Sequence, residues 1–454
     1  MGTEGSTLKV LMFPWLAHGH ISPYLTVSKK LADRGWYVYL CSTPVNLNFI
    51  KKRILQNYSL SIQLVELHLP ELPELPPSYH TTNGLPPHLN ATLKRAAKMS
   101  KPEFSRILEN LKPDLLIHDV VQPWAKGVAN SHNIPAIPLI TFGAAVISYF
   151  IHQMKKPGID FRYPAIYLRK IEQQRLQEMM KNVAKDKDPD DDEDPFAEDP
   201  TRIILLMSSS ATEAKYIDYL TELTQSKYVS VGPPVQEPMN EDDGDMDLID
   251  WLGKKDEHST VYVSFGSEYF LTKEDMEEIA YGLELSNINF IWVVRFPKGE
   301  EVKLEEALPQ GFLERIENRG RVVSGWAPQP RILSHPSTGG FVSHCGWNSV
   351  MESIDFGVPI IPMPMHLDQP FNARLMVELG VAVEIDRDAE GKVHREEVAQ
   401  VIKSVICKET GKNLREKVKD ISENLKSMRQ EEMDVVVEEL IQLCKNSTCI
   451  NSSS

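Results

Sequence analysis

Short apolar runs alternate with amphipathic stretches along both halves of the chain. In the first half these runs predict strands at residues 9–14, 37–41, 62–66, 114–118, 136–141 and 202–207. In the second half they predict strands at 260–265, 289–294, 321–323, 340–343, 358–362 and 382–385. Val-, Ile- and Leu-rich strands separated by helical patterns are typical of parallel sheets covered on both faces. The pattern therefore predicts two successive α/β units of the doubly wound type.

The boundary between the two units is expected where Gly232-Pro233-Pro234 interrupts regular structure and an acidic, polar stretch follows. The last helix of the second unit can pack back on the first unit. The predicted parts are a first domain at 1–232, a linker at 233–247, a second domain at 248–445 and a disordered tail at 446–454.

Composition narrows the classes of partner. The chain has 454 residues, enough for two domains, and a formal net charge of −15. This charge would repel nucleic acid and anionic membranes, so neither is expected as a general partner. The sequence lacks an apolar run of about 18 residues and a signal-peptide pattern, so no stable membrane insertion is expected. Its five cysteines show no CxxC spacing, which favours the cytoplasm. Nothing in the sequence demands a dimer, so we expect a monomer.

Polar residues after strands are the first place to look for chemistry, because ligands of open α/β sheets bind at the carboxyl ends of the strands. His20 follows the first strand and is expected on a loop just before a helix, with Ser22 as the cap. The positive end of the helix dipole would keep its imidazole neutral and able to accept a proton. A structural role is the alternative, and a metal pair with His18 has no further ligand pattern to support it.

Asp119 follows the strand at 114–118, again at a carboxyl end. If the two strands are neighbours, this carboxylate can approach His20, fix its tautomer and stabilise the imidazolium that forms. A helix cap or a salt bridge is the alternative role for Asp119. The sequence contains neither GxGxxG after the first strand nor GxSxG, which argues against a dinucleotide-binding oxidoreductase and an α/β-hydrolase.

The most specific motif lies in the second half. It contains Trp326-Ala327-Pro328-Gln329, His335, Gly339-Gly340-Phe341, His344-Cys345-Gly346-Trp347-Asn348-Ser349, Glu352, Gly357-Val358-Pro359, Pro364 and Asp368-Gln369. This stretch closely resembles the signature box of plant UDP-dependent glycosyltransferases (glycosyltransferase family 1). GHxxP near the N-terminus, the Asp after a PD-hydrophobic strand and Val263–Ser267 extend the resemblance to the whole chain. It implies the GT-B fold, with two facing Rossmann-like domains and an interdomain cleft.

The start of the helix that follows 340–343 favours an anion on physical grounds, because backbone N–H groups and the helix dipole point to it. His344, Asn348 and Ser349 add donors for a diphosphate, whose developing charge they would stabilise as UDP leaves. These groups would replace a metal, so no metal or other cofactor is expected. Asp243-Gly244-Asp245 has the look of a metal-binding DxD motif, but it lies in the acidic linker and is rejected as one.

The resemblance implies a role for each matching residue. Trp326 would stack on uracil, Glu352 would bind the ribose, and Trp347 would lie at the sugar; for both tryptophans core packing is the alternative. His20 would be the base and Asp119 its partner. The donor-binding residues would be Thr141, Ser267, Trp326, Ala327, Gln329, His344, Gly346, Trp347, Asn348, Ser349, Glu352, Asp368 and Gln369.

Gln369 and Trp347 favour UDP-glucose as the donor, although His366 departs from what relatives often carry. The stretches Met12–Leu16, Thr81–Leu85 and Ser267–Leu271 resemble plant enzymes that extend sugar chains. We therefore expect an inverting enzyme that adds a β-linked glucose, through a 1→6 or 1→2 linkage, to a small-molecule glycoside. Direct glucosylation of an aglycone hydroxyl is the alternative. A non-catalytic UDP-sugar sensor is disfavoured, because His20 and Asp119 are both present.

Overall fold

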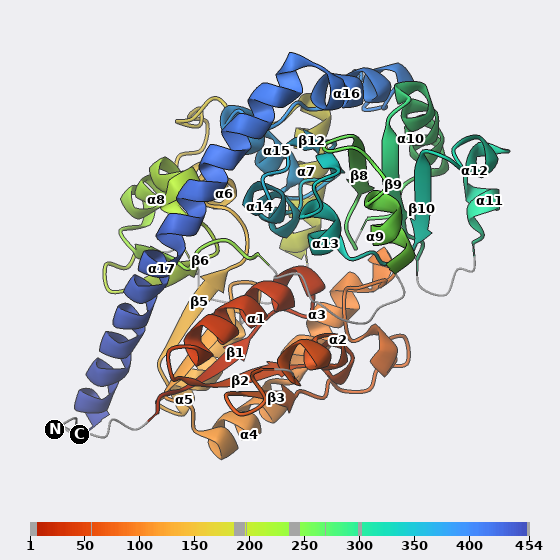
Figure 1. The fold of residues 1–454 in the computed structure, drawn as a ribbon. Coiled ribbons are helices and arrows are strands. Elements are labelled where there is room, and N and C mark those ends of the chain that lie inside the picture. The colour runs from red at the N-terminus through yellow and green to blue at the C-terminus, as the bar shows by residue number, and fades with distance from the viewer. Residues whose placement is uncertain are drawn as a thin grey trace. The chain divides into compact units, whose positions relative to one another are not determined.

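The computed structural model describes residues 7–55, 57–185, 196, 198–235, 246–267, 269–297 and 302–451. The chain forms two compact units (Figure 1). Unit 1 comprises Met1–Ile151, Asp186–Pro234 and Met428–Ser454. Unit 2 comprises His152–Lys185 and Val235–Ser427.

Unit 1 contains a seven-stranded parallel sheet in the order β3-β2-β1-β4-β5-β6-β7. Its strands are β1 (Lys9–Phe13), β2 (Tyr37–Ser42), β3 (Ile62–Glu66), β4 (Leu115–Asp119), β5 (Ala136–Ile140), β6 (Ile203–Leu206) and β7 (Lys227–Ser230). The chain builds outward from β1 in one direction and then returns to add β4 on its other side. This reversal makes the carboxyl ends of β1 and β4 the topological switch point, where open α/β sheets bind their ligands.

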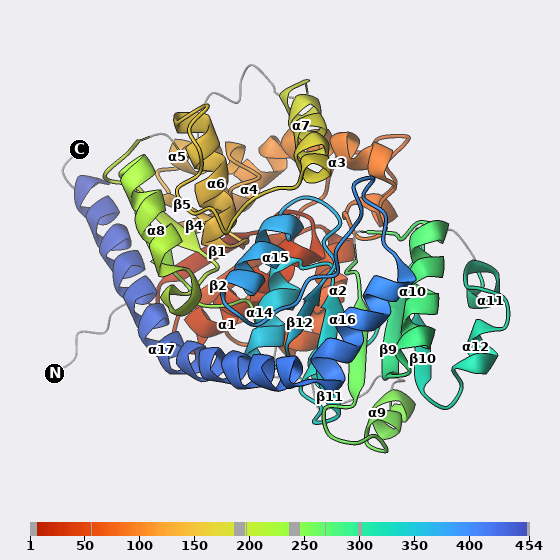
Figure 2. The same cartoon turned by 90° about the horizontal axis from the view of Figure 1, so that it is seen from above.

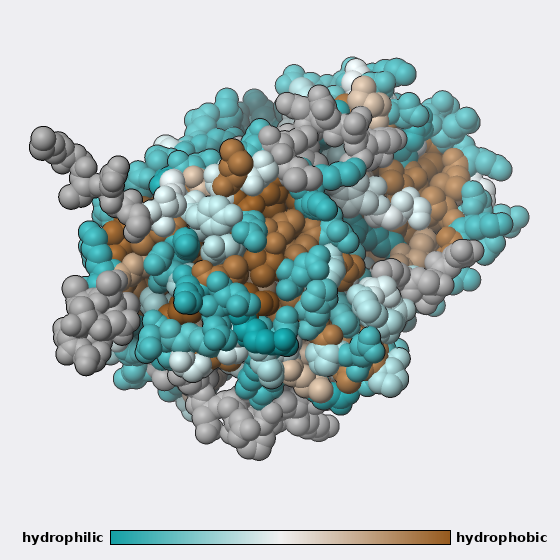
Figure 3. Space-filling model, turned by 90° about the horizontal axis from the view of Figure 1, so that it is seen from below, coloured by the Kyte–Doolittle hydropathy of each residue, from teal (hydrophilic) through white to brown (hydrophobic). Residues whose placement is uncertain are grey.

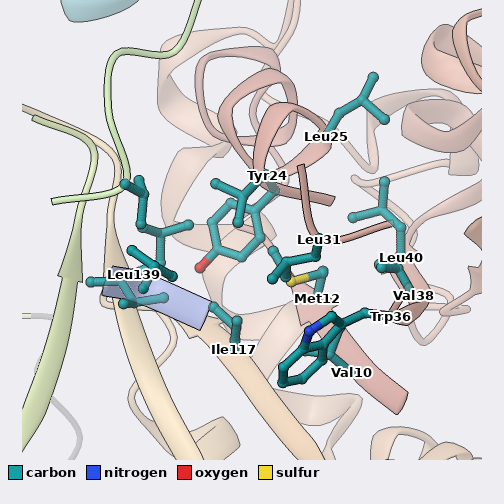
Figure 4. Close-up of a cluster of buried hydrophobic side chains, with 14 of the residues drawn as sticks. Val10, Met12, Tyr24, Leu25, Leu31, Trp36, Val38, Leu40, Ile117 and Leu139 are labelled. Carbon is teal, nitrogen blue, oxygen red and sulfur yellow. The ribbon is translucent and has the colours of Figure 1, made fainter. Parts of the chain in front are cut away.

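Helices cover both faces of this sheet because its strands bury both sets of side chains. Val10 and Met12 belong to one hydrophobic cluster, and Leu11 and Phe13 to another, as the alternation of a strand requires. Figure 4 shows the first cluster, with Tyr24 among Met12, Leu31 and Ile117. The helices of this part of the chain are α1 (His18–Ala32), α2 (Pro44–Leu55), η1 (Pro77–Tyr79), η2 (Pro87–Leu89), α3 (Asn90–Met99), α4 (Lys101–Leu111), α5 (Trp124–Ser131), α6 (Ala144–Lys155) and α8 (Ser210–Thr224).

Unit 2 contains a five-stranded parallel sheet in the order β10-β9-β8-β11-β12. Figure 2 labels β9, β10, β11 and β12 of this sheet. Its strands are β8 (Thr260–Ser264), β9 (Asn289–Val294), β10 (Gly320–Ser324), β11 (Thr338–Ser343) and β12 (Ile360–Pro362). Its helices are α7 (Lys170–Lys185), α9 (Met246–Leu252), α10 (Lys273–Ser286), α11 (Leu304–Ala307), α12 (Phe312–Arg315), α13 (Gln329–Leu333), α14 (Trp347–Asp355), α15 (Gln369–Glu378) and α16 (Arg395–Cys407). The switch point of this second sheet lies between β8 and β11. The expectation of two doubly wound units is confirmed.

Two strand predictions are wrong. The sequence analysis missed β7, whose four residues include only two consecutive apolar ones, Tyr228 and Val229. The predicted strand at 382–385 is not a strand: it forms an isolated bridge between Ala382 and Ile360, and the N–H groups of Val383 and Ile385 donate to the carbonyls of Ile360 and Pro362. Its neighbour β12 is three residues long and ends in Pro362, which has no N–H to extend a ladder.

The last helix, α17 (Glu409–Asn451), extends further than expected. It continues to Asn451 where the sequence analysis predicted a disordered tail from 446, and residues 452–454 lie outside the described part. No Gly or Pro occurs between 446 and 451 to stop the helix. Met433, Val436 and Leu440 of this helix belong to the core of unit 1.

The segment 152–185 belongs to unit 2, although the sequence analysis had placed it in the first domain. Arg374, whose side chain is 2% exposed, pairs at 2.9 Å with both Glu172 and Glu384. Arg169 pairs with Glu384 at 2.9 Å and also with Asp386. Breaking a buried ion pair of this kind is costly, so the network fixes α7 on unit 2. The functional division into an acceptor domain and a donor domain stays a prediction.

Figure 3 shows a face of the molecule on which hydrophobic and hydrophilic side chains both reach the surface. The most exposed large apolar side chains are Leu60, Met246, Ile159 and Met154, at 60–90% exposure. Singly exposed apolar residues are normal for a folded chain and indicate no particular partner. Across the part of the chain that the structure describes, no helix combines the length and apolar character that a membrane crossing requires.

Candidate active site

His20 lies in the first turn of α1, not on the loop that the sequence predicted. The helix begins at His18, and the carbonyl of Ala17 accepts hydrogen bonds from the backbone N–H groups of His20 and Ile21 at 2.9 Å. Ser22 is therefore a buried residue of the helix and not its cap. The positive end of the helix dipole still favours a neutral His20 imidazole, because the dipole acts within the first turn.

Two side chains from separate strand ends meet at the His20 imidazole. Its Nδ1 lies 2.7 Å from Oδ2 of Asp119, at the end of β4, and 2.9 Å from Oγ1 of Thr141, directly after β5. Asp119 is fully buried, whereas the His20 side chain is 21% exposed. The hydrogen-bond pattern assigns the proton to Nδ1, which leaves Nε2 as the proton acceptor. The arrangement can therefore perform general-base chemistry.

The backbone holds the carboxylate of Asp119 in place. Its Oδ2 accepts a hydrogen bond from the N–H of Trp15 at 3.2 Å, and its Oδ1 accepts one from the N–H of Val121 at 3.1 Å. Hydrogen bonds to both oxygens satisfy a buried charge that would otherwise be costly. Asp119 thus bridges the β1–α1 turn and the end of β4.

Tyr24 adds a neutral, buried side chain one turn along α1 from His20. Burial, and then the negative charge of Asp119, raise the pKa of the Tyr24 phenol well above its usual value. Its hydroxyl has no hydrogen-bond partner in the described part of the chain. The phenol therefore keeps its proton, and no second negative charge forms beside Asp119.

The turn from β11 to α14 places His344 against two glycines. A Cβ atom at Gly266 would lie 2.5 Å from Nε2 of His344, and one at Gly346 would lie 2.7 Å from it. Gly266 also has a φ of +75°, which glycine adopts without strain. Burial, with smaller contributions from the charges of His366 and Arg295, lowers the pKa of His344 to about 3. His344 is therefore neutral at physiological pH.

The residues expected at the nucleoside form one hydrogen-bonded group between α13 and α14. Nε2 of Gln329 lies 2.8 Å from Oε2 of Glu352 and 3.2 Å from Oγ of Ser349. Trp326 is 45% exposed, so its ring can stack on a ligand, whereas Trp347 is only 4% exposed and packs in the interior. Ala327 is buried in the hydrophobic cluster beside Ile332 and Leu333.

The side chain of Gln369 stabilises the turn that precedes α15 through hydrogen bonds. Oε1 of Gln369 accepts hydrogen bonds from the N–H groups of Met365 and His366 at 3.0 Å, and its Nε2 lies 3.0 Å from Nδ1 of His366. Oδ2 of Asp368 accepts a hydrogen bond of 2.7 Å from Asn372, which also donates to the carbonyl of Cys345 at 2.9 Å. Asn372 therefore ties this turn to the turn that carries His344.

The sequence analysis missed Arg295, which directly follows β9. Burial lowers the pKa of its guanidinium, and its Nε atom is buried without a hydrogen-bond partner. The rule that singled out His20 and Asp119, a polar residue directly after a strand, also applies to Arg295. Arg295 lies outside the 326–369 motif, so the resemblance assigns it no role.

Within the described residues, no group of three or more His, Cys, Asp or Glu side chains could hold a metal ion. The His18 ring stacks on Phe49 with the ring centroids 3.8 Å apart. Asp243-Gly244-Asp245 lies outside the described residues.

Comparisons with known proteins agree over residues 6–236 and 238–436. The model of the family "UDP-glucoronosyl and UDP-glucosyl transferase" matches residues 238–436, and that of "Glycosyltransferase, N-terminal domain" matches 6–236. A β-D-glucosyl crocetin β-1,6-glucosyltransferase of Gardenia jasminoides is 56% identical, over 96% of this chain and 99% of its own. A mogroside IIIx synthase of Siraitia grosvenorii is 49% identical, over 97% and 94%. A Phytolacca americana structure with UDP-2-fluoro-glucose and pterostilbene superposes with a TM-score of 0.77 at 26% identity, over 97% and 100%.

Proposed function

We propose that this chain, which belongs to the UDP-glucoronosyl and UDP-glucosyl transferase family with its GT-B fold, transfers glucose from UDP-glucose to the sugar of a small-molecule glycoside. The transfer is inverting and gives a β-linkage. The observation that carries the proposal is the 2.7 Å contact between His20 and Asp119 at the switch point of unit 1. Its support beyond that contact is the similarity to a relative named as a glucosyltransferase of glucosyl crocetin and to one named as a mogroside IIIx synthase.

In the proposed mechanism, Nε2 of His20 removes the proton of an acceptor hydroxyl as that oxygen attacks C1 of the glucose. The bond between the acceptor oxygen and C1 forms while the bond from C1 to the diphosphate oxygen breaks, and UDP leaves from the opposite face. Asp119 stabilises the imidazolium, and Thr141, 2.9 Å from Nδ1, holds the ring in register. An α-linked donor thus gives a β-glycoside.

Unit 2 would hold the leaving group. The N-terminus of α14, with His344, Gly346, Asn348 and Ser349 around it, presents hydrogen-bond donors to the diphosphate. Ser267 would also contact the diphosphate, and Trp326 would stack on uracil. Gln329 and Glu352, already joined at 2.8 Å, would bind the ribose side of the nucleoside, with Ala327 beside them. Trp347, Asp368 and Gln369 would enclose the sugar.

The acceptor proposal rests on the two relatives, which are named for glucosyl crocetin and mogroside chemistry. The cytoplasmic location, the monomeric state and the independence from metal stay predictions.

An assay by mass spectrometry tests the proposal. The protein is incubated with UDP-glucose and with matched pairs of plant aglycones and their monoglucosides, with EDTA and without added metal. We expect a gain of one hexosyl unit on the monoglucosides only. A gain on the aglycones would replace the proposal by direct glucosylation. Loss of activity in EDTA would contradict the metal-free assignment of the diphosphate turn.

A further inference from the structure

Arg295 differs from Arg374 and Arg387, two other arginines of unit 2 with a buried Nε atom, in having no carboxylate partner among the described residues. Arg374 pairs with Glu172 and Glu384, and Arg387 lies 3.6 Å from a carboxylate oxygen of Asp275. The Arg295 side chain is half-buried, its Nε atom is buried without a hydrogen-bond partner, and no described carboxylate forms an ion pair with its guanidinium. Partly burying a guanidinium without an opposite charge carries a desolvation cost, so an arginine kept in this state needs another reason.

The sheet register places Arg295 between two strand ends that carry site residues. Val293 of β9 pairs with Ser264 of β8, so the register continues from Arg295 to Gly266, the glycine that packs against His344. On the other side, the N–H of Gly325 donates to the carbonyl of Val294 at 2.9 Å, and Trp326 follows directly. Arg295 thus lies at the carboxyl edge of the sheet, between the His344 turn and the Trp326 loop.

The neighbours of Arg295 confirm this position. Ile291 and Val293 of β9 belong to the same hydrophobic cluster as Tyr262. Side chains two residues apart on a strand share a face, so Arg295, two residues after Val293, is expected on this face as well. The positive charge of Arg295 helps to lower the pKa of His344. The Tyr262 phenol interacts with the Arg295 guanidinium and counteracts the lowering of the guanidinium pKa by burial. The guanidinium therefore acts on the same turn that the proposed function assigns to the diphosphate.

We propose that Arg295 is a further donor-binding residue, whose guanidinium binds the diphosphate of the UDP-sugar. A planar guanidinium presents parallel N–H donors that match two phosphate oxygens. It would supply the positive charge that the neutral His344 cannot, and it would stabilise the charge that develops on UDP as the sugar departs. The inference rests on the proposed function, because it assumes that unit 2 binds a UDP-sugar.

Calorimetric titration with UDP and with uridine separates a phosphate contact from a nucleoside contact. Arg295→Met should weaken binding of UDP on the order of 10- to 100-fold, as expected for lost charge-assisted hydrogen bonds, and leave uridine binding unchanged. Arg295→Lys should recover part of the loss, since it restores the charge without the planar fork. Arg315→Met is the matched control: it removes an arginine paired with Glu284 at the surface and should change neither ligand.

Thermal unfolding of the same variants gives an independent measurement. Without ligand, Arg295→Met should melt no lower than the wild type, because the substitution removes a half-buried charge that has no carboxylate partner among the described residues. Its stabilisation by UDP should shrink. Unchanged UDP affinity, an equal loss for UDP and uridine, or failure of Arg295→Met to fold would each overturn the proposal. If the wild type itself bound no UDP, the proposed function would fail with it, and the wild-type titration shows this separately.

Discussion

The charged residues at the strand ends of the two sheets differ in whether the protein itself supplies their partners. In unit 1, the buried carboxylate of Asp119 has its hydrogen bonds supplied by His20, Trp15 and Val121. In unit 2, His344 is neutral and the Arg295 guanidinium has no carboxylate partner among the described residues. The first arrangement is complete within the protein and suits the movement of a proton. The second has a positive charge that an anionic ligand would balance, which suits a leaving group.

The largest expected effect breaks the unit 1 side of this comparison. His20→Ala should lower kcat by about 10²–10⁴, because a positioned general base contributes that much to a proton transfer. UDP binding, measured by calorimetry, should stay at the wild-type value, since His20 belongs to unit 1. His18→Ala is the control: His18 lies in the same helical turn as His20, and its ring stacks on Phe49. Wild-type turnover by His20→Ala would remove His20 from the mechanism.

The second prediction asks which partner orients the imidazole. Asp119→Asn should lower kcat roughly 100-fold, because the amide can donate to Nδ1 and so favour the wrong tautomer. Thr141→Val should cost only a few-fold to about tenfold, the size of a single neutral hydrogen bond. Steady-state kinetics at saturating UDP-glucose measures both variants. If Thr141→Val had the larger effect, the hydroxyl and not the carboxylate would be the orienting group, and the assignment of Asp119 would fail.

The sequence predicts these strand ends well for a physical reason. In a parallel sheet all carboxyl ends share one edge, so polar residues after strands meet there even when they lie far apart in the chain. His20, Asp119 and Thr141 meet in this way. Strand limits are also well predicted where apolar runs are bounded by polar residues, as at 289–294.

Other features depend on contacts that no local pattern contains. Arg374 and Glu172, which hold α7 on unit 2, are 202 residues apart in the chain. The edge strand β7 is too short to show a period. The special state of Arg295 consists in a missing partner, which becomes visible only when all neighbours are placed. A search for every charged residue directly after a strand would have found its position but not its isolation.

The smallest effect concerns the neutrality of the unit 2 turn. Burial lowers the pKa of His344 from 6.5 to about 3, so between these pH values the unfolded chain binds a proton that the folded chain does not. The free energy of unfolding must therefore fall as the pH drops below about 6.5, by up to about 1.4 kcal/mol per pH unit from this group alone. His344→Gln removes the group, so its stability should fall less steeply.

Urea unfolding at pH 7, 6 and 5 without ligand measures this slope. His258→Gln is the matched control, because the His258 side chain is 45% exposed and lies outside the turn. We expect the control to follow the wild type and His344→Gln to diverge from both as the pH falls. If all three curves were parallel, His344 would protonate in the folded protein. The turn would then carry its own positive charge, and Arg295 would no longer be needed to explain how unit 2 holds a diphosphate.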